Sequence, residues 1–436
     1  MKIFVLLLLS GAALFAGDTS AKQSAKPPNV TFYRDVLPVL QQRCQGCHRP
    51  GEVGPMAFGA YDETRPWAKA IKQAVLLGKM PPWYADAPSG RFHNDPRLSQ
   101  QEIDKLVAWA DTGAPAGNPK DAPRPLTFLD GWSIDQPDAI FQVPTPFQIP
   151  ATGTLEYTYV IVPTGFKEDR WITQVEVRPG NRAVVHHANV YIREPGSNWL
   201  REYPPGKLFV PEERGERVGT GGSSSAGASV REQVIAGYSP GRPAKQVPDG
   251  YAMLIPAGSD LVFQLHYTTN GKPATDVTRI GFVFAKITPS KRVIRVQASN
   301  AGFVIPPGAE DYPVAGSAKL GVDCELLNVY PHMHLRGKSM VLSALYPTGE
   351  REEFVRVPHY DFNWQLVYGL SQPRILPKGT VLKADATFDN SANNRSNPNP
   401  KVSVRWGDQS WDEMMVGFFD LAIPISTDPA SVLSSQ

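Results

Sequence analysis

The chain has 436 residues and a net charge of +2, from 44 Lys or Arg and 42 Asp or Glu side chains. This near balance provides no basic footprint for nucleic acid or for an anionic membrane surface. The 42 prolines disfavour an all-α fold, because proline removes a helix N–H donor and clashes with the preceding turn. We therefore expect loop-rich β architecture and no nucleic-acid partner.

The chain begins with the pattern of a secretory signal peptide. Lys2 precedes an apolar run over residues 3–16 that ends in small residues. This run is shorter than the roughly 20 apolar residues that a transmembrane helix needs. The sequence therefore predicts a signal peptide over residues 1–21, a periplasmic or secreted protein, and no membrane insertion after cleavage.

A Cys-x-x-Cys-His motif follows at residues 44–48. Two thiols at this spacing, Cys44 and Cys47, can form thioethers to one haem, and His48 is then placed beneath the iron as an axial ligand. The alternative is a redox dithiol, which would call for a thioredoxin-like βαβ context that the surrounding sequence lacks. We predict one covalent haem c.

The segment around this motif has helical patterns. Apolar residues recur at helical spacing over 36–40 and 66–77, and a capping box opens a helix over 99–113. Met80 lies in a proline-stiffened loop and is the expected sixth haem ligand, with Met56 as the rival. These features predict a small all-α cytochrome c-like domain over residues 28–115, similar to bacterial class I-like c-type cytochromes.

A Pro/Gly-rich linker over 116–130 separates this segment from a region of different periodicity. Short β-branched or aromatic runs follow, separated by turn residues. They cover residues 158–162, 171–177, 184–192, 261–268, 279–285 and 340–344. The predicted fold class is thus multidomain: the all-α cytochrome domain, then two antiparallel β-sandwich (jelly-roll-like) domains over 131–298 and 299–428.

Histidine is scarce in the sequence, and its placement is informative. The chain has eight histidines, and five of them fall in strand-like contexts of the β-rich region. They are His186, His187, His266, His332 and His334. Neutral imidazoles grouped in this way suit copper or zinc. The adjacent pair can reach one metal only if the backbone is twisted or bulged there, or if the two rings use different nitrogens.

Residues 140–426 resemble the copper type II, ascorbate-dependent monooxygenases, the peptidylglycine α-hydroxylating and dopamine β-monooxygenase family. The resemblance rests on a His-His pair, a His in an apolar-His-Tyr strand, a His-x-His pair and a later Met, here Met414. It implies two copper ions in two sandwich domains that face each other across a cleft. His186, His187 and His266 would hold the electron-transfer copper, and His332, His334 and Met414 the catalytic copper that meets O2.

The resemblance implies hydroxylation of a substrate C–H bond, with one oxygen atom of O2 going to the product and the other to water. Electrons would come from an ascorbate-like donor, from a redox protein or from the attached haem. The family's peptide-binding Arg is replaced by Tyr330, which disfavours a peptidylglycine substrate and leaves an unknown small molecule. The segment 359–364 could line the cleft near the second copper. The alternative is a non-catalytic haem/copper electron-transfer or copper-binding protein. A structural zinc protein fits the histidines but not the methionine.

Overall fold

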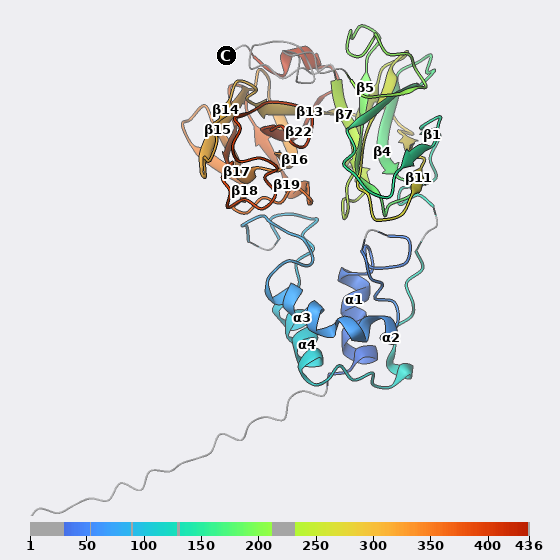
Figure 1. Ribbon diagram of the computed structural model, residues 1–436. Coiled ribbons are helices and arrows are strands. Elements are labelled where there is room, and N and C mark those ends of the chain that lie inside the picture. Colours follow the sequence, from blue (N-terminus) through green and yellow to red (C-terminus); the bar gives the residue numbers. More distant parts are fainter. Residues whose placement is uncertain (1–29, 53, 89, 129–130, 212–231, 435–436) are drawn as a thin grey trace, which may run out of the picture.

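The computed structural model describes residues 30–52, 54–88, 90–128, 131–211 and 232–434. Two β lobes lie side by side, and a segment with short helices lies below them (Figure 1). The predicted signal peptide falls outside the described residues. Within them, the helices are too short or too polar to cross a bilayer.

The N-terminal segment packs around a small apolar core. Its helical elements are η1 (Phe32–Val36), α1 (Leu37–Arg43), α2 (Tyr61–Thr64), η2 (Arg65–Trp67), α3 (Ala68–Leu76) and α4 (Gln100–Asp111); η3 (Pro119–Asp121) follows them. Phe32, Leu40 and Trp109 are fully buried between these elements. The capping box forms as expected, because the Ser99 side chain accepts the Glu102 N–H while the Glu102 carboxylate accepts the Ser99 N–H.

The prediction of an all-α cytochrome c domain over 28–115 is wrong. Strands hold 37% of the described residues and helices only 12%, and the longest helix of this segment has 12 residues. The described parts of 44–60 and 77–99 contain little helix because prolines and glycines interrupt them, as at Pro81 and Pro82. Some apolar residues of the segment do not pack in its own core, since Trp83 and Phe92 are buried in the core of a β lobe.

The first lobe is a two-layer β structure. One layer contains β1 (Ala139–Gln142), β12 (Arg279–Phe284), β4 (Arg170–Arg178), β9 (Tyr251–Ile255) and the short β8 (Lys245–Gln246). The facing layer has the order β6 (Leu208–Phe209), β3 (Thr158–Pro163), β10 (Asp260–Tyr267), β5 (Val185–Arg193) and β7 (Glu232–Tyr238). A small sheet pairs β2 (Phe147–Ile149) with β11 (Ala274–Asp276). Alternate residues such as Val175, Phe263 and Phe282 fill the core between the layers.

The second lobe repeats this arrangement with two four-stranded layers. One has the order β13 (Lys291–Ser299), β22 (Val416–Pro424), β16 (Cys324–His332) and β19 (Tyr368–Leu376). The other has the order β15 (Tyr312–Lys319), β20 (Val381–Phe388), β17 (Gly337–Leu345) and β18 (Arg351–Val357). The remaining elements are β14 (Val304–Ile305), β21 (Val404–Arg405) and η4 (Pro429–Ser431). Phe354, Phe388 and Phe419 are buried between the layers.

The lobes are not two separate antiparallel sandwiches, which is a second correction to the predicted fold class. A parallel pairing of β9 with β13 joins one layer of each lobe into a single nine-stranded sheet. β13, which precedes the expected boundary at residue 299, pairs along its whole length with β22 of the second lobe. The continuous sheet fixes the lobes relative to each other.

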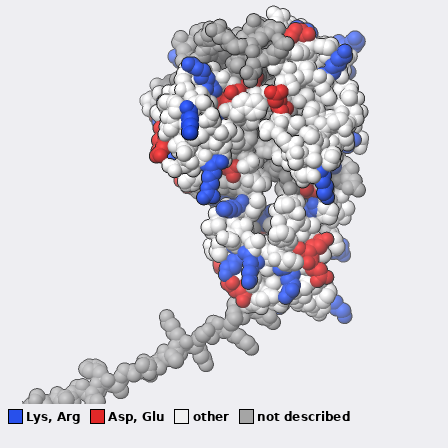
Figure 2. Space-filling model, viewed as in Figure 1, with Lys and Arg blue, Asp and Glu red and all other residues white. Residues whose placement is uncertain are grey.

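The N-terminal segment contacts both lobes. Phe92 forms a β-bridge with Leu370 of β19, and the Asp86 N–H donates to the Arg356 carbonyl oxygen of β18 at 2.8 Å. On the other side, Arg182 of the first lobe forms an ion pair with Glu52 at 2.6 Å. The segment with the cysteine motif is therefore anchored beneath the lobes. Charges of both signs are scattered over the face seen in Figure 2, in keeping with the near-neutral net charge.

Candidate metal centres and their cavity

Three histidines converge on β5 and β10, which are neighbouring antiparallel strands of one sheet. His187 is paired with His266 across the two strands, and the register then shifts so that Tyr267 pairs with Val185. His186 is thus the extra residue of a β-bulge, which turns its side chain toward the same place as that of His187. The bulge supplies the local irregularity that an adjacent His-His pair requires.

The ligating nitrogens of these three side chains lie within 4.8 Å of one another. The Nδ1 atoms of His186 and His187 are 3.2 Å apart, a separation that fits two bonds of about 2 Å to one metal ion. Burial lowers the pKa of all three imidazoles, and that of His266 to about 3. The buried Nδ1 of His266 has no hydrogen-bond partner among the described residues. Neutral imidazoles with an unsatisfied nitrogen suit a bound metal ion.

The second pair of histidines lies where β16 ends. The ring centres of His332 and His334 are 5.3 Å apart, because residues i and i+2 of an extended chain share a face. The Nδ1 of His332 lies 2.9 Å from the Gln365 side-chain oxygen, so Nδ1 carries the proton and Nε2 is left for a metal. Burial lowers the pKa of His332 to about 4. The buried Nδ1 of His334 has no hydrogen-bond partner in the described part of the chain.

Met414 lines the same cavity as His332 and His334, while its neighbour Met415 is fully buried in the core of the second lobe. The buried Glu413 carboxyl group, whose pKa burial raises to about 8, holds this arrangement. It accepts the backbone N–H groups of His334 at 3.0 Å, Arg336 at 2.6 Å and Met414 at 3.3 Å. Glu413 thus fixes the backbone at His334 and Arg336 as well as at Met414.

We expect Glu413→Gln to weaken metal binding at the second site by about 10- to 100-fold, the usual effect of losing a group that orients ligands. The amide has only one oxygen to accept these N–H groups, so the backbones of His334 and Met414 lose support. Copper affinity measured by competition with a chromogenic chelator tests this. Glu325→Gln, at the opposite end of β16 from His332, is the control, and equal affinities of the two variants would contradict the role of Glu413.

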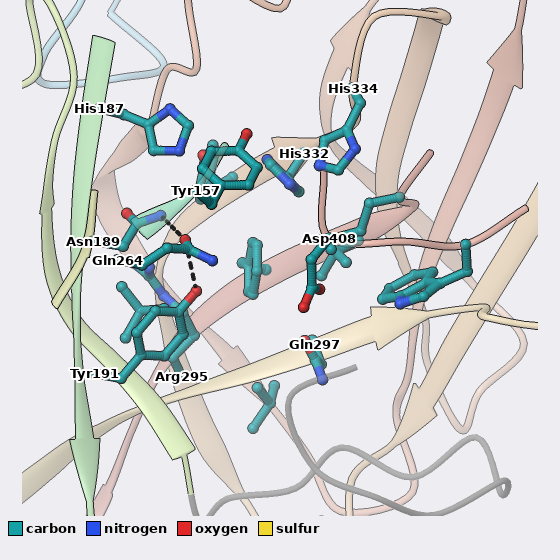
Figure 3. A pocket seen from close by; sticks show the side chains of 17 residues that line it. Tyr157, His187, Asn189, Tyr191, Gln264, Arg295, Gln297, His332, His334 and Asp408 are labelled. Atoms are coloured by element: carbon teal, nitrogen blue, oxygen red, sulfur yellow. Dashed lines mark hydrogen bonds between the residues drawn. The ribbon is translucent and has the colours of Figure 1, made fainter. Parts of the chain in front are cut away.

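His187 of the first cluster lines the same cavity as His332, His334 and Met414, and this cavity has about 950 Å³ of empty space, including its opening to solvent. In Figure 3, His187 lies on one wall and His332 and His334 on the opposite wall, with Tyr157 between them. The Phe362 ring stacks on His186 with ring centres 5.4 Å apart and lies 6.0 Å from the His334 ring. One aromatic side chain therefore bridges the two sites, and it comes from the segment 359–364.

Several cavity residues were not anticipated from the sequence. Gln264 accepts hydrogen bonds from Asn189 at 3.2 Å and Tyr191 at 3.3 Å, and it donates to the Tyr159 hydroxyl. Arg295 lines the far end of the cavity. The alternation of β5 and β10 offered a signal for Asn189 and Gln264, because each lies two residues from a histidine and shares its face.

The cysteine motif lies in the N-terminal segment, with neither Cys44 nor Cys47 in a disulfide. Burial raises the pKa of the Cys44 thiol to about 12, whereas a reactive redox thiol needs a lowered pKa. The His48 Nδ1 lies 3.2 Å from the Met56 carbonyl oxygen, and the Phe58 ring stacks on the imidazole at 4.5 Å. This orientation leaves Nε2 of His48 for an iron atom.

Met80 is half-buried in the loop after α3. No hydrogen bond or ring contact joins it to the cysteine motif within the described residues, so its role as sixth ligand remains a prediction.

The cysteine motif lies against the first lobe. Burial raises the pKa of the Cys47 thiol, and the nearby charge of Glu52 raises it further, while the backbone of Gly241 opposes this increase. The Arg182 guanidinium, paired with Glu52, lies 5.8 Å from the Tyr238 ring centre. Tyr238 pairs with Ala188 of β5, which directly follows His187. The motif is thus packed near the strands that carry the first histidine cluster.

No family model and no curated protein matches this chain. Solved structures aligned with it include that of the infectious bursal disease virus Gx strain, with 8% identity, TM-score 0.17, and coverage of 69% of this chain and 77% of that one. An allantoicase structure aligns with 10% identity and TM-score 0.16, covering 56% and 79%. TM-scores this low carry no argument about fold or function.

Proposed function

We propose that the protein is an exported copper-dependent monooxygenase that hydroxylates a C–H bond of a small molecule with O2. The observation that carries this proposal is that three imidazoles converge at one place, and one of them, His187, lines a cavity that two further imidazoles and a thioether line on the other side. The unsatisfied buried nitrogens of His266 and His334 support a metal at each position. An electron carrier needs only one such site.

The donor sets fit copper. His186, His187 and His266 would hold one ion through nitrogen alone, and His332, His334 and Met414 would hold the other with a soft sulfur ligand that favours Cu(I). Copper bound there would supply electron transfer at the first site and O2 activation at the second. Hydroxylation of R–H by O2 to give R–OH and water consumes two electrons and two protons. An external ascorbate-like donor or redox protein supplies these electrons.

The protein's own residues prepare this chemistry. Gln365 fixes the tautomer of His332, and Glu413 fixes the backbone around His334 and Met414. Tyr157 packs on His187 and His266 with ring centres 5.2 and 4.5 Å away. Such packing excludes water from the first cluster and keeps its imidazoles neutral.

We also propose that Cys44, Cys47 and His48 hold one haem c, which passes electrons to the first copper site. The ion pairs of Glu52 with Arg49 and Arg182 support a fixed position of the motif beside the first lobe. Attachment to the same chain raises the effective concentration of the donor at the acceptor.

Cys44→Ala/Cys47→Ala protein should contain no covalent haem, because both thioether positions are lost. The alkaline pyridine absorbance spectrum of protein from a haem-maturing host measures this, with the buried Cys324→Ala variant as control. The proposed electron transfer from the haem to the first copper site would be contradicted if the haem-free variant turned over at the wild-type rate with its physiological reductant.

The monooxygenase proposal is tested by metal content and by isotope labelling. We expect two copper ions and one haem per chain, a type 2 Cu(II) EPR signal, and 18O from 18O2 in a hydroxylated product. A single copper, with no labelled product among candidate small molecules, would instead support a non-catalytic haem/copper carrier.

A further inference from the structure

A buried cationic cluster lies at the end of the cavity opposite the histidines. Arg295 of β13 is 8% exposed and lines the cavity, and Figure 3 shows it well away from His332 and His334. Its Nε and Nη2 donate to the Asp420 carboxylate at 2.6 and 3.0 Å. Its Nη1 forms no hydrogen bond within the described ranges and remains for another acceptor.

Two further cationic side chains, Lys245 and Arg242, lie near Arg295. Lys245 lies 3.3 Å from the same Asp420 carboxylate, and the Arg242 guanidinium lies over the Tyr330 ring at 5.6 Å. Burial lowers the pKa of Arg242 to about 10 and that of Lys245 to about 8, and repulsion from Arg295 adds to both decreases. Among the described residues, Asp420 is the carboxylate that forms ion pairs with Arg295 and Lys245, so these three cations carry surplus positive charge over it. Asp408 lines the cavity on the side of His334 (Figure 3).

An aromatic surface connects this cluster with the second histidine site. The rings of Tyr330 and Phe418 stack with centres 5.3 Å apart. Arg295 lies 5.6 Å from the Phe418 ring, and His332 lies 6.0 Å from the Tyr330 ring and 6.2 Å from the Phe418 ring. A ligand with its charge at the cationic cluster would lay an apolar body along these rings toward Met414.

We propose that the substrate carries an anionic group of the carboxylate class, bound by Arg295 and stabilised by the nearby charges of Arg242 and Lys245, and an apolar body that extends along Tyr330 and Phe418 to the second metal site. This inference rests on the proposed function and specifies its substrate class. Guanidinium groups suit this task because their planar N–H donors match a carboxylate. A buried cation gains most from such a partner, because water does not screen it.

The test compares two nearly isosteric probes, 3-phenylpropanoate and its neutral amide 3-phenylpropanamide, by titration calorimetry with the full-length protein. We expect the wild type to bind the acid at least about tenfold more tightly than the amide, the scale of one charge-assisted hydrogen bond. Arg295→Gln should bring the ratio close to one, and Arg242→Gln should reduce it, because a nearby positive charge is lost. Arg292→Gln should leave the ratio unchanged, because this half-buried arginine lies near the charges of Glu194, Asp169 and Asp428 and not near Arg295.

Equal binding of the two probes by the wild type, or no binding of either, would overturn the proposal, as would an unchanged ratio in Arg295→Gln or in Arg242→Gln. Should either variant fail to fold, Lys245→Gln provides the second test, with a reduced ratio expected. The titrations are repeated after copper has been removed with a chelator. If the protein prefers the acid but does not bind two copper ions, the anion site is supported and the monooxygenase proposal is refuted. If it binds two copper ions but does not prefer the acid, the monooxygenase proposal stands and the anion site is refuted.

Discussion

Met414→Leu should abolish hydroxylation and weaken one of the two Cu(I) sites, whereas the same substitution at Met415 should change neither property. Met414 lines the cavity beside His332 and His334, while Met415 is fully buried in the second lobe. Loss of a group that merely orients ligands costs 10- to 100-fold in metal affinity, so loss of the sulfur itself should cost at least about 100-fold. Leu and Met have similar volumes, which keeps the packing change small at both positions.

Competition of each variant with a Cu(I)-specific chromogenic chelator measures this affinity, and ascorbate-driven O2 consumption in the presence of substrate measures turnover. The adjacent pair is a close control, because both variants carry the same substitution in the same segment. Unaltered Cu(I) affinity in Met414→Leu would mean that the thioether is not a ligand.

Asp420→Asn should destabilise the protein by about 3–5 kcal/mol, the usual cost of removing one partner from a buried ion pair. Burial by itself would raise the pKa of this carboxyl, but Arg295 and Lys245 more than offset it and hold the pKa well below the usual range. The stabilisation is therefore present at neutral pH. It is lost as the pH falls below the unfolded-state value of about 4 toward the lower folded-state value.

Chemical denaturation at neutral pH measures the change in the free energy of unfolding. Asp385→Asn is the control, since its ion pair with Arg351 is exposed to solvent, and such pairs contribute at most about 1 kcal/mol. A loss of stability no larger in Asp420→Asn than in the control would show that the cations are not held by this carboxylate.

Local sequence patterns predict the strands well where β-branched and aromatic residues form continuous runs. The predicted run 184–192 corresponds to β5 (Val185–Arg193), and 261–268 to β10 (Asp260–Tyr267). Both strands are buried on their two faces, as shown by Phe263 in the core of the first lobe and Val262 in a second cluster. The histidines could be grouped because they fall in such strand-like runs. The β-bulge at His186 depends on cross-strand pairing, and residue spacing could only show that some irregularity was needed.

Features that depend on tertiary contacts could not be predicted from the sequence. Trp83 and Phe92 have the apolar character of residues from a helical core, but they pack into the second lobe, and nothing local indicates that destination. The pairing of Arg295 with Asp420 joins strands far apart in sequence, and charged residues on a strand ordinarily predict a solvated face. The merging of the two lobes into one sheet likewise depends on the short contact of β9 with β13.

The contact of residues 86–92 with the second lobe has a consequence for self-association. β19 is the last strand of its layer and β18 the last strand of the layer opposite, and the bonds from Phe92 and Asp86 occupy backbone groups on both. Unpaired outer strands are templates for pairing between molecules. A truncated chain that begins after residue 95 would expose the edges of these strands, so we expect it to self-associate by strand addition more readily than the full chain.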